Sequence, residues 1–174
     1  MNTSAAAAAL SRSGSGSLRL GVLALSCSAV LVTAFIGAWG SADAPAVYAS
    51  LRQPAWAPPA WLFGPAWTLL YALMAIAAWL VVRAAGWMRA RWALMVYGLQ
   101  LVANAAWSWF FFRWELGPAA FGEAVVLAVL VGVTTILFWR LRPLAGALLL
   151  PLLAWTTFAA VLSGAMWRLN PGDL

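Results

Sequence analysis

Apolar residues fill five long runs of this chain, and shorter stretches with charged, small or proline residues separate them. Each run is long enough to cross a bilayer as a helix, which takes about 20 residues. The pattern therefore predicts an all-α membrane protein, a bundle of five transmembrane helices near residues 18–40, 62–83, 92–112, 119–139 and 143–167. Because the links after the second, third and fourth runs are short, consecutive helices should be antiparallel neighbours.

Two segments fall outside these runs. Residues 1–17 are small, polar and rich in Gly and Ser, which predicts a disordered N-terminal extension. The five-helix transmembrane domain is then expected over residues 18–170. The second segment, residues 41–61, is the long link between the first and second runs.

The most unusual stretch overlaps the end of this link. Residues 54–67 hold three tryptophans and four prolines. Proline lacks an N–H group and clashes with the preceding turn, so such a density does not suit a helix interior. The aromatic surface is also too large for an idle, solvated linker. We predict a stiff loop that forms the rim or lid of a site for a flat hydrophobic ligand.

Composition narrows the class of protein. The chain is 66% hydrophobic and only 8% charged, whereas about a quarter of the residues of a soluble domain are charged. All ten basic residues are arginine, but none forms a basic patch on a soluble module, so no nucleic-acid partner is expected. The chain has no histidine, its four acids are scattered, and Cys27 is its one cysteine. A metal site, the usual haem ligand, a carboxylate-pair hydrolase and an intrachain disulfide are therefore not expected.

The arginines also predict an orientation. With five spans, the N-terminus and the links at 84–91 and 140–142 lie on one side, which holds seven of the ten arginines. In a bacterial inner membrane this bias places the N-terminus inside and the 41–61 link outside. We expect an integral, multi-pass protein of a bacterial cell membrane or an organelle membrane.

One face of the third run is polar. Gln100, Asn104 and Ser108 recur every four residues, and Trp107 borders them. A polar side chain in hydrocarbon is costly unless it is paired or faces a cavity. For Gln100 and Ser108 we favour hydrogen bonding between helices. For Asn104, ligand contact and helix–helix hydrogen bonding are equally open.

The fifth run carries an aromatic stripe. Four residues at positions i, i+3, i+4 and i+7 share a face: Trp155, Phe158, Ala159 and Leu162. Such a stripe is more often core packing, but here a tryptophan lies well inside a span, and Ala159 leaves lateral room for a ring. Trp67 and Tyr71 form an i, i+4 pair in the second run. The two faces predict an aromatic slot, capped by the loop at Trp56–Trp61.

The fourth run has a stripe of small residues every four positions: Ala120, Ala124, Ala128 and Gly132. Small residues let helices approach closely, so the stripe fits either packing within the bundle, which we favour, or a homodimer seam. Glu123, one position away, is expected to be a charge in the headgroup region rather than a proton relay.

Several strings occur together in an order typical of one family: Tyr48–Leu51, Pro54–Trp61, Phe63–Tyr71 with Met74, Gln100–Ser108, and Pro151–Trp155 with Phe158–Ala160 and Trp167–Asn170. Over residues 20–170 the chain resembles the tryptophan-rich sensory protein and translocator protein family, the peripheral-type benzodiazepine receptors. The resemblance implies a five-helix membrane bundle, often dimeric. It also implies a pocket that binds porphyrins and benzodiazepine-type ligands.

The resemblance assigns residues to that pocket. With Tyr48 and Phe158 added, the candidate ligand-binding set is Tyr48, Trp56, Trp67, Asn104, Trp107, Trp155, Phe158, Ala159 and Leu162. No conventional catalytic residues are expected, and the candidate photochemical residues are Trp56, Trp67 and Trp155. The chain departs from the family at Leu152, where a tyrosine is frequent. The stretch Val161–Arg168 also lacks the tyrosine of the animal sterol motif.

These inferences leave three functions open. The leading one is tetrapyrrole binding for sensing, transport or disposal, with protoporphyrin IX or haem as the ligand and no required cofactor or metal. The alternative is an enzyme-like, light-dependent degradation of protoporphyrin IX through the pocket tryptophans. The third is a structural membrane partner without a ligand. The expected partners are a porphyrin or another flat hydrophobic ligand, membrane lipid and, in a homodimer, a second copy of the chain.

Overall fold

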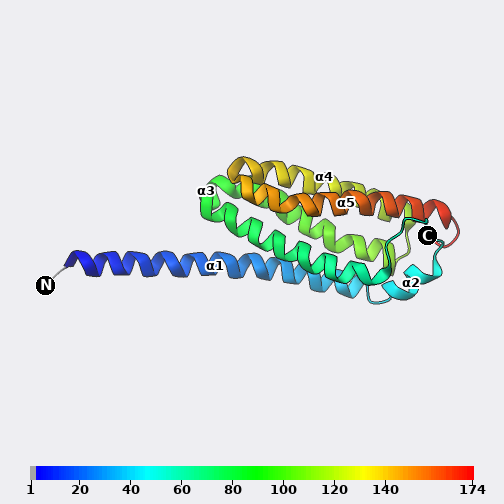
Figure 1. Cartoon of the computed structure of the whole chain (residues 1–174), viewed down its shortest axis with the longest axis horizontal. Helices are drawn as coiled ribbons and strands as arrows, with labels where there is room; N and C mark the ends of the chain where they lie inside the picture. Colours follow the sequence, from blue (N-terminus) through cyan, green and yellow to red (C-terminus); the bar gives the residue numbers. More distant parts are fainter. Residues whose placement is uncertain (1–2) are drawn as a thin grey trace.

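The computed structural model describes residues 3–174, with side chains from Leu20 onward. Every regular element in this range is helical: α1 (Thr3–Gly40), α2 (Ala44–Ser50), the 3-10 helix η1 (Ala60–Leu62), α3 (Phe63–Ser108), the π-helical turn η2 (Trp109–Arg113), α4 (Gly117–Leu141) and α5 (Pro143–Leu169). The long helices pack along one axis, and α2 and the C-terminus lie at the same end of the bundle (Figure 1). The predicted all-α fold is confirmed.

The second and third predicted runs form one element, α3, which folds back on itself. At 46 residues, α3 is far too long for a single membrane crossing. The chain leaves the helical conformation at Gly86, where φ is 71° and ψ is 165°. Glycine reaches this positive φ because it has no Cβ. The arm before Gly86 (63–85) and the arm after it (87–108) therefore run in opposite directions (Figure 1).

Four stretches of the described chain are long and apolar enough to cross a membrane: Leu20–Gly40, Ala60–Arg113, Gly117–Leu141 and Pro143–Leu169. They coincide with the predicted runs, except that the two arms of α3 are counted as one. The turn between α4 and α5 is tight because α5 begins with Pro143 and because Gly146 leaves room for α4. A Cβ on Gly146 would lie 2.7 Å from the Cα of Trp139.

The first helix extends beyond its predicted start. The backbone of residues 3–17 continues α1 as helix, although the composition predicted a disordered extension there. Five consecutive alanines, Ala5–Ala9, favour helix in this segment. The side chains of residues 1–19 lie outside the described part of the chain. The division into an extension and a transmembrane domain at residue 18 stays a prediction.

Two apolar clusters fill the interior. The larger one joins α1, both arms of α3, α4 and α5 around fully buried side chains such as Met74, Phe138 and Leu149. The second lies at the α2 end and surrounds Trp107 and Met166. Each long helix therefore has at least one face fixed by packing, which positions the polar residues between the helices.

The small-residue stripe of α4 packs inside the bundle. Ala120 and Ala124 are fully buried in the single chain, and a Cβ on Gly132 would lie 3.7 Å from Leu153 of α5. Packing within the bundle explains these three positions, and a homodimer stays a prediction. Glu123 differs from the expectation. Both of its carboxylate oxygens are buried without a hydrogen-bond partner among the described residues, because its position lies between inward-facing residues of α4.

Candidate functional site

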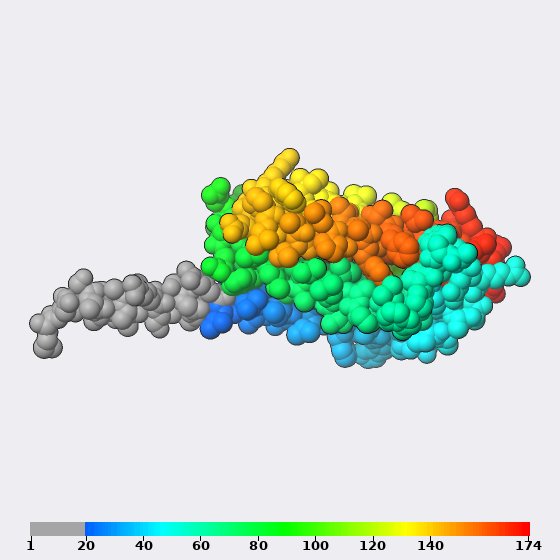
Figure 2. Space-filling model, in the orientation of Figure 1, coloured from blue at the N-terminus to red at the C-terminus, as the bar shows by residue number. Residues whose placement is uncertain are grey.

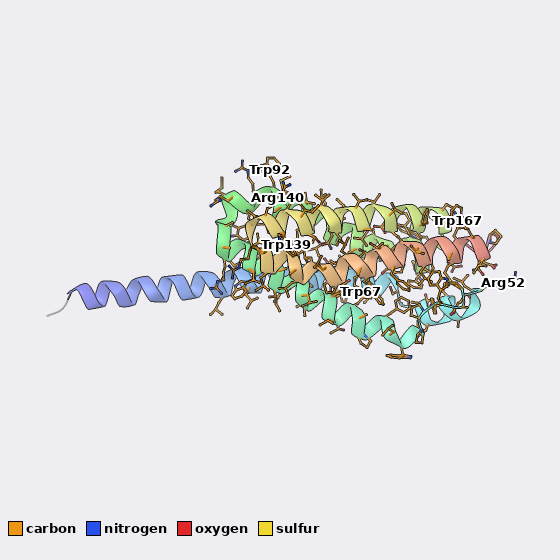
Figure 3. The ribbon with its side chains drawn as sticks, turned by 45° about the horizontal axis from the view of Figure 1, so that its top comes forward. Arg52, Trp67, Trp92, Trp139, Arg140 and Trp167 are labelled. Carbon is orange, nitrogen blue, oxygen red and sulfur yellow. The ribbon has the colours of Figure 1, made fainter. Side chains whose placement is uncertain are left out.

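A cavity of about 320 Å³ lies in the half of the bundle near α2. Its walls come from α1, α2, η1, both arms of α3 and η2. Aromatic side chains form much of the lining: Tyr48, Phe63, Trp67, Tyr71, Trp107 and Phe112. Figure 3 shows Trp67 in this half of the bundle, between Trp139 at one end and Arg52 at the other. The cavity volume is at the lower end of the range typical of small-molecule sites.

The first arm of α3 presents two rings to the cavity. The rings of Trp67 and Tyr71 lie 5.4 Å apart at an angle of 31°, so the predicted pair on one helix face is confirmed. The two arms of α3 are joined here, because the Tyr71 hydroxyl donates a 2.8 Å hydrogen bond to Oδ1 of Asn104. The antiparallel turn at Gly86 brings these residues together from opposite arms.

Two buried donors on the second arm have no hydrogen-bond partner in the described part of the chain. Asn104 is 3% exposed and Trp107 is 8% exposed. Neither Nδ2 of Asn104 nor Nε1 of Trp107 has a hydrogen-bond partner among the described residues. An unsatisfied buried donor costs about 1–3 kcal/mol. Both residues line the cavity, so a ligand with an acceptor group there would relieve this cost.

The other two members of the polar face of the second arm have different environments. Gln100 is fully buried away from the cavity lining, and its Nε2 lies 3.5 Å from Sδ of Met74 on the first arm. This contact fits the predicted role in helix–helix hydrogen bonding. Ser108 instead lines the cavity, whereas the sequence pattern favours an interhelical hydrogen bond for it.

The wall contributed by α1 was missed by the sequence interpretation. Three small residues of α1 line the cavity, together with the residue that directly follows its end: Ala34, Gly37, Ala38 and Ser41. Their spacing of i, i+3, i+4 and i+7 is that of one helix face, and this is the signal that could have identified them. A Cβ on Gly37 would lie 3.7 Å from the Tyr71 hydroxyl. Small side chains on α1 therefore leave the space that the aromatic residues of α3 face.

The structure brings four of the nine candidate residues to the cavity wall: Tyr48, Trp67, Asn104 and Trp107. The other five lie outside its lining: Trp56, Trp155, Phe158, Ala159 and Leu162. Leu162 borders a separate small void of about 10 Å³, which also contacts Tyr48 and Trp107. A ligand role for these five residues stays a prediction.

Phe63 separates the stripe of α5 from the cavity. Phe63 lines the cavity, and the ring of Trp155 packs edge-on against it at 5.8 Å. Phe158 in turn contacts Trp155 at 5.9 Å and Trp56 at 5.8 Å. The α5 residues therefore form a second aromatic layer behind Phe63. Asn104 and Trp155 do not line the same cavity, and their shared membership of one ligand site stays a prediction.

The 41–61 link closes one end of the cavity. Tyr48 of α2 and Ala60 of η1 both contribute to its wall. The Tyr48 hydroxyl donates a 2.8 Å hydrogen bond to the Pro58 carbonyl, which ties the two ends of the link together. Burial raises the pKa of the Tyr48 phenol above its usual range, so the group remains a neutral donor.

Asn170, after the end of α5, fastens the same link to the bundle. Its Oδ1 accepts a 2.8 Å hydrogen bond from the backbone N–H of Arg52, and its Nδ2 donates a 3.0 Å bond to the Arg52 carbonyl. We call this pair of bonds the Asn170 latch. The link is therefore an ordered cover over one end of the cavity. Its movement with ligand stays a prediction.

This arrangement, a cavity between antiparallel apolar helices closed by a Trp/Pro loop, can be compared with known proteins. Residues 25–168 match the model of the TspO/MBR family. The chain belongs to this family. As a family member with several long apolar helices, it is an integral, multi-pass membrane protein.

Three relatives show how widely this family likeness extends. Protein CrtK of Rhodobacter capsulatus is 37% identical over 142 residues, which is 79% of this chain and 87% of that protein. The translocator protein of Homo sapiens is 38% identical over 131 residues, 72% of this chain and 75% of that protein. The tryptophan-rich protein TspO of Archaeoglobus fulgidus is 36% identical over 149 residues, 85% of this chain and 96% of that protein.

Proposed function

We propose that this TspO/MBR family member binds tetrapyrroles such as protoporphyrin IX in the cavity, for their sensing, transport or disposal. The main support for the proposal is the combination of aromatic walls with two buried donors, Nδ2 of Asn104 and Nε1 of Trp107, that have no partner among residues with described side chains. A flat, largely apolar ring system with carboxylate or carbonyl groups has the shape and the acceptors that match this wall.

We also infer that the bundle crosses the membrane five times. Each arm of α3, 63–85 and 87–108, has about the 20 residues that a crossing needs. The hydrogen bond between Tyr71 and Asn104 pairs the arms at points 15 residues before and 18 residues after Gly86. Two antiparallel crossings joined at Gly86 follow from this pairing, and α1, α4 and α5 supply the other three.

The ligand should be held by stacking and shape rather than through iron. The chain has no histidine, which is the commonest axial ligand of haem. Free-base protoporphyrin is therefore expected to bind without iron. A bound haem whose spectrum shows two nitrogen ligands would contradict this part of the proposal.

A titration of the full chain in detergent tests the proposal. Protoporphyrin IX is added, and binding is read from the absorbance of the porphyrin. A ring contact contributes roughly 0.5–1.5 kcal/mol beyond burial. Loss of this contact in Trp67→Leu should raise the Kd about 2- to 13-fold. Asn104→Leu should also raise the Kd, because it removes a donor from the wall.

The matched control is Trp92→Leu, since Trp92 is 62% exposed and lies at the opposite end of the bundle (Figure 3). Its affinity for the porphyrin should equal that of the wild type. An unchanged Kd in both cavity variants, with folding retained, would reject the cavity as the binding site.

The indoles on the wall also favour the second candidate function, light-dependent degradation of the porphyrin. Trp67 and Trp107 both line the cavity and would lie close enough to a bound photosensitiser to exchange electrons with it. Illumination of the complex separates the two functions. If a porphyrin breakdown product accumulates under light, and less of it forms in Trp67→Phe, the enzyme-like function is supported. If the porphyrin stays intact, binding without degradation is supported.

A further inference from the structure

The end of the bundle opposite α2 carries a cluster of arginines on two neighbouring turns. One turn, residues 83–92, joins the arms of α3, and the other, residues 139–143, joins α4 to α5. Figure 1 places both turns at the same end, and their surfaces adjoin in Figure 2. Five exposed arginines lie on them: Arg83, Arg89, Arg91, Arg140 and Arg142. We call this surface the arginine end.

No acid balances these five arginines. The four acids of the chain are Asp43, Glu115, Glu123 and Asp173. Asp43 lies just before α2, and Asp173 lies after α5. Glu115 lies just before α4, and Glu123 lies in its first two turns. All four are therefore toward the other end of the bundle. Among residues with described side chains, the ion pair is Arg113 with Asp43 at 3.3 Å, also at that other end.

Aromatic rings hold some of the guanidinium groups in place. The Arg83 guanidinium carbon lies 4.6 Å from the centroid of the Trp79 ring, and that of Arg91 lies 5.5 Å from the Trp92 ring. A guanidinium over a ring is attracted by its face and keeps its N–H edge available for an anion. The side chains are therefore partly ordered before any ligand arrives.

Exposed tryptophans mark the level of this surface in the membrane. Trp87, Trp92 and Trp139 are 49%, 62% and 45% exposed, and Figure 3 shows Trp92 and Trp139 beside Arg140. Tryptophan is enriched where hydrocarbon meets the headgroups, because its ring is apolar and its N–H is polar. In a bilayer, the arginines beside these rings are therefore expected at the level of the lipid phosphates.

We propose that the arginine end is a binding surface for anionic phospholipids, which it selects over zwitterionic lipids through their headgroup phosphates. Guanidinium groups match phosphate oxygens with paired hydrogen bonds. Each basic residue near an anionic surface favours binding by about fivefold. The opposite end lacks this selectivity, because Arg52, Arg113 and Arg168 share it with the four acids.

Native mass spectrometry of the full chain tests the proposal. The protein in a neutral detergent is mixed with equal amounts of phosphatidylglycerol and phosphatidylcholine, and the bound lipids are counted. The wild type should retain phosphatidylglycerol in preference. The double variant Arg140→Gln/Arg142→Gln should lower that preference by up to about 25-fold, from fivefold per arginine. The charge-preserving Arg140→Lys/Arg142→Lys should keep most of it.

The matched control is Arg52→Gln/Arg168→Gln, which removes the same charge from the opposite end. Figure 3 shows Arg52 at that end, away from Arg140. This control should keep the wild-type preference, and 1 M salt should weaken the preference of the wild type by screening. Equal binding of the two lipids by the wild type, or equal losses in the two Gln double variants, would overturn the proposal.

Discussion

The Asn170 latch gives the sharpest prediction, because one side chain fastens the 41–61 link to α5. Asn170 is 3% exposed and makes both bonds of the latch to the backbone of Arg52. It donates a third bond to the Met166 carbonyl, which caps its own helix. Asn170→Ala removes all three bonds. Asn170→Asp keeps the side-chain size and the acceptor but removes both donated bonds.

The size of the effect follows from the two bonds of the latch. Each intramolecular hydrogen bond contributes a net ~0.5–1.5 kcal/mol, so the latch stabilises the closed link by about 1–3 kcal/mol. Other contacts remain after the substitution, including the ring contact of Trp56 with Phe158 at 5.8 Å and the exposed ion pair of Arg113 with Asp43. The link should therefore open locally while the bundle stays folded.

Hydrogen exchange of the full chain in detergent measures this opening. A loss of 1–3 kcal/mol in Asn170→Ala corresponds to about 5- to 150-fold faster exchange of the amides in residues 51–62. Asn170→Asp should speed exchange at least as much, because its carboxylate would face the Arg52 and Met166 carbonyls in a buried position. Arg168→Gln, an exposed change on the same helix end, should show no increase. Unchanged exchange in Asn170→Ala, with an unchanged thermal midpoint, would refute the latch as the fastening of the link.

Three further predictions concern other parts of the molecule. Gly86→Ala should destabilise the bundle by about 1–3 kcal/mol in thermal unfolding, because φ of 71° with ψ of 165° is a conformation that essentially only glycine adopts; Gly98→Ala, in open helical space, should not. Burial raises the pKa of the Tyr48 phenol above 10.0 in the folded state. The stabilisation that the neutral phenol gives to the folded state is therefore complete below pH 10 and is lost as the pH rises through the pKa of the folded state. Tyr48→Phe should remove this part of the pH dependence of stability. Trp155→Phe, outside the cavity wall, should weaken porphyrin binding less than Trp67→Leu in the same titration; equal losses would contradict the geometry.

Part of the site could be predicted from the spacing of residues along each helix. The i, i+4 pair of Trp67 and Tyr71, and the neighbours Asn104 and Trp107, share helix faces whatever the helices pack against. All four line the cavity in the structure. The cost of an amide in hydrocarbon also identified Asn104 as a residue that needs a partner or a cavity, and it has both.

The aromatic layer of α5 behind Phe63 could not be predicted from the sequence. The sequence predicts Trp155 and Asn104 in one pocket; in the structure Asn104 lines the cavity, and Trp155 packs against Phe63 of the first arm, which lies at the cavity wall. Periodicity gives the face that Trp155 shares with Phe158, and it does not give the neighbour that the face meets. That neighbour depends on how α5 is rotated and how far the first arm of α3 is displaced along it.

The sequence by itself determined the five long apolar helical runs, their membrane environment, the family and the turns between the runs, because these depend on run length, composition and local backbone chemistry. Only the tertiary structure decided which faces enclose the cavity, including the small-residue face of α1 around Gly37. The physical reason is that lipid, rather than water, surrounds the helices. Lipid is as apolar as a protein interior, so outward residues such as Leu31 and Val102 look the same in sequence as the buried Leu149. Inward faces are then set by the mutual fit of all the helices, which no single run of sequence contains.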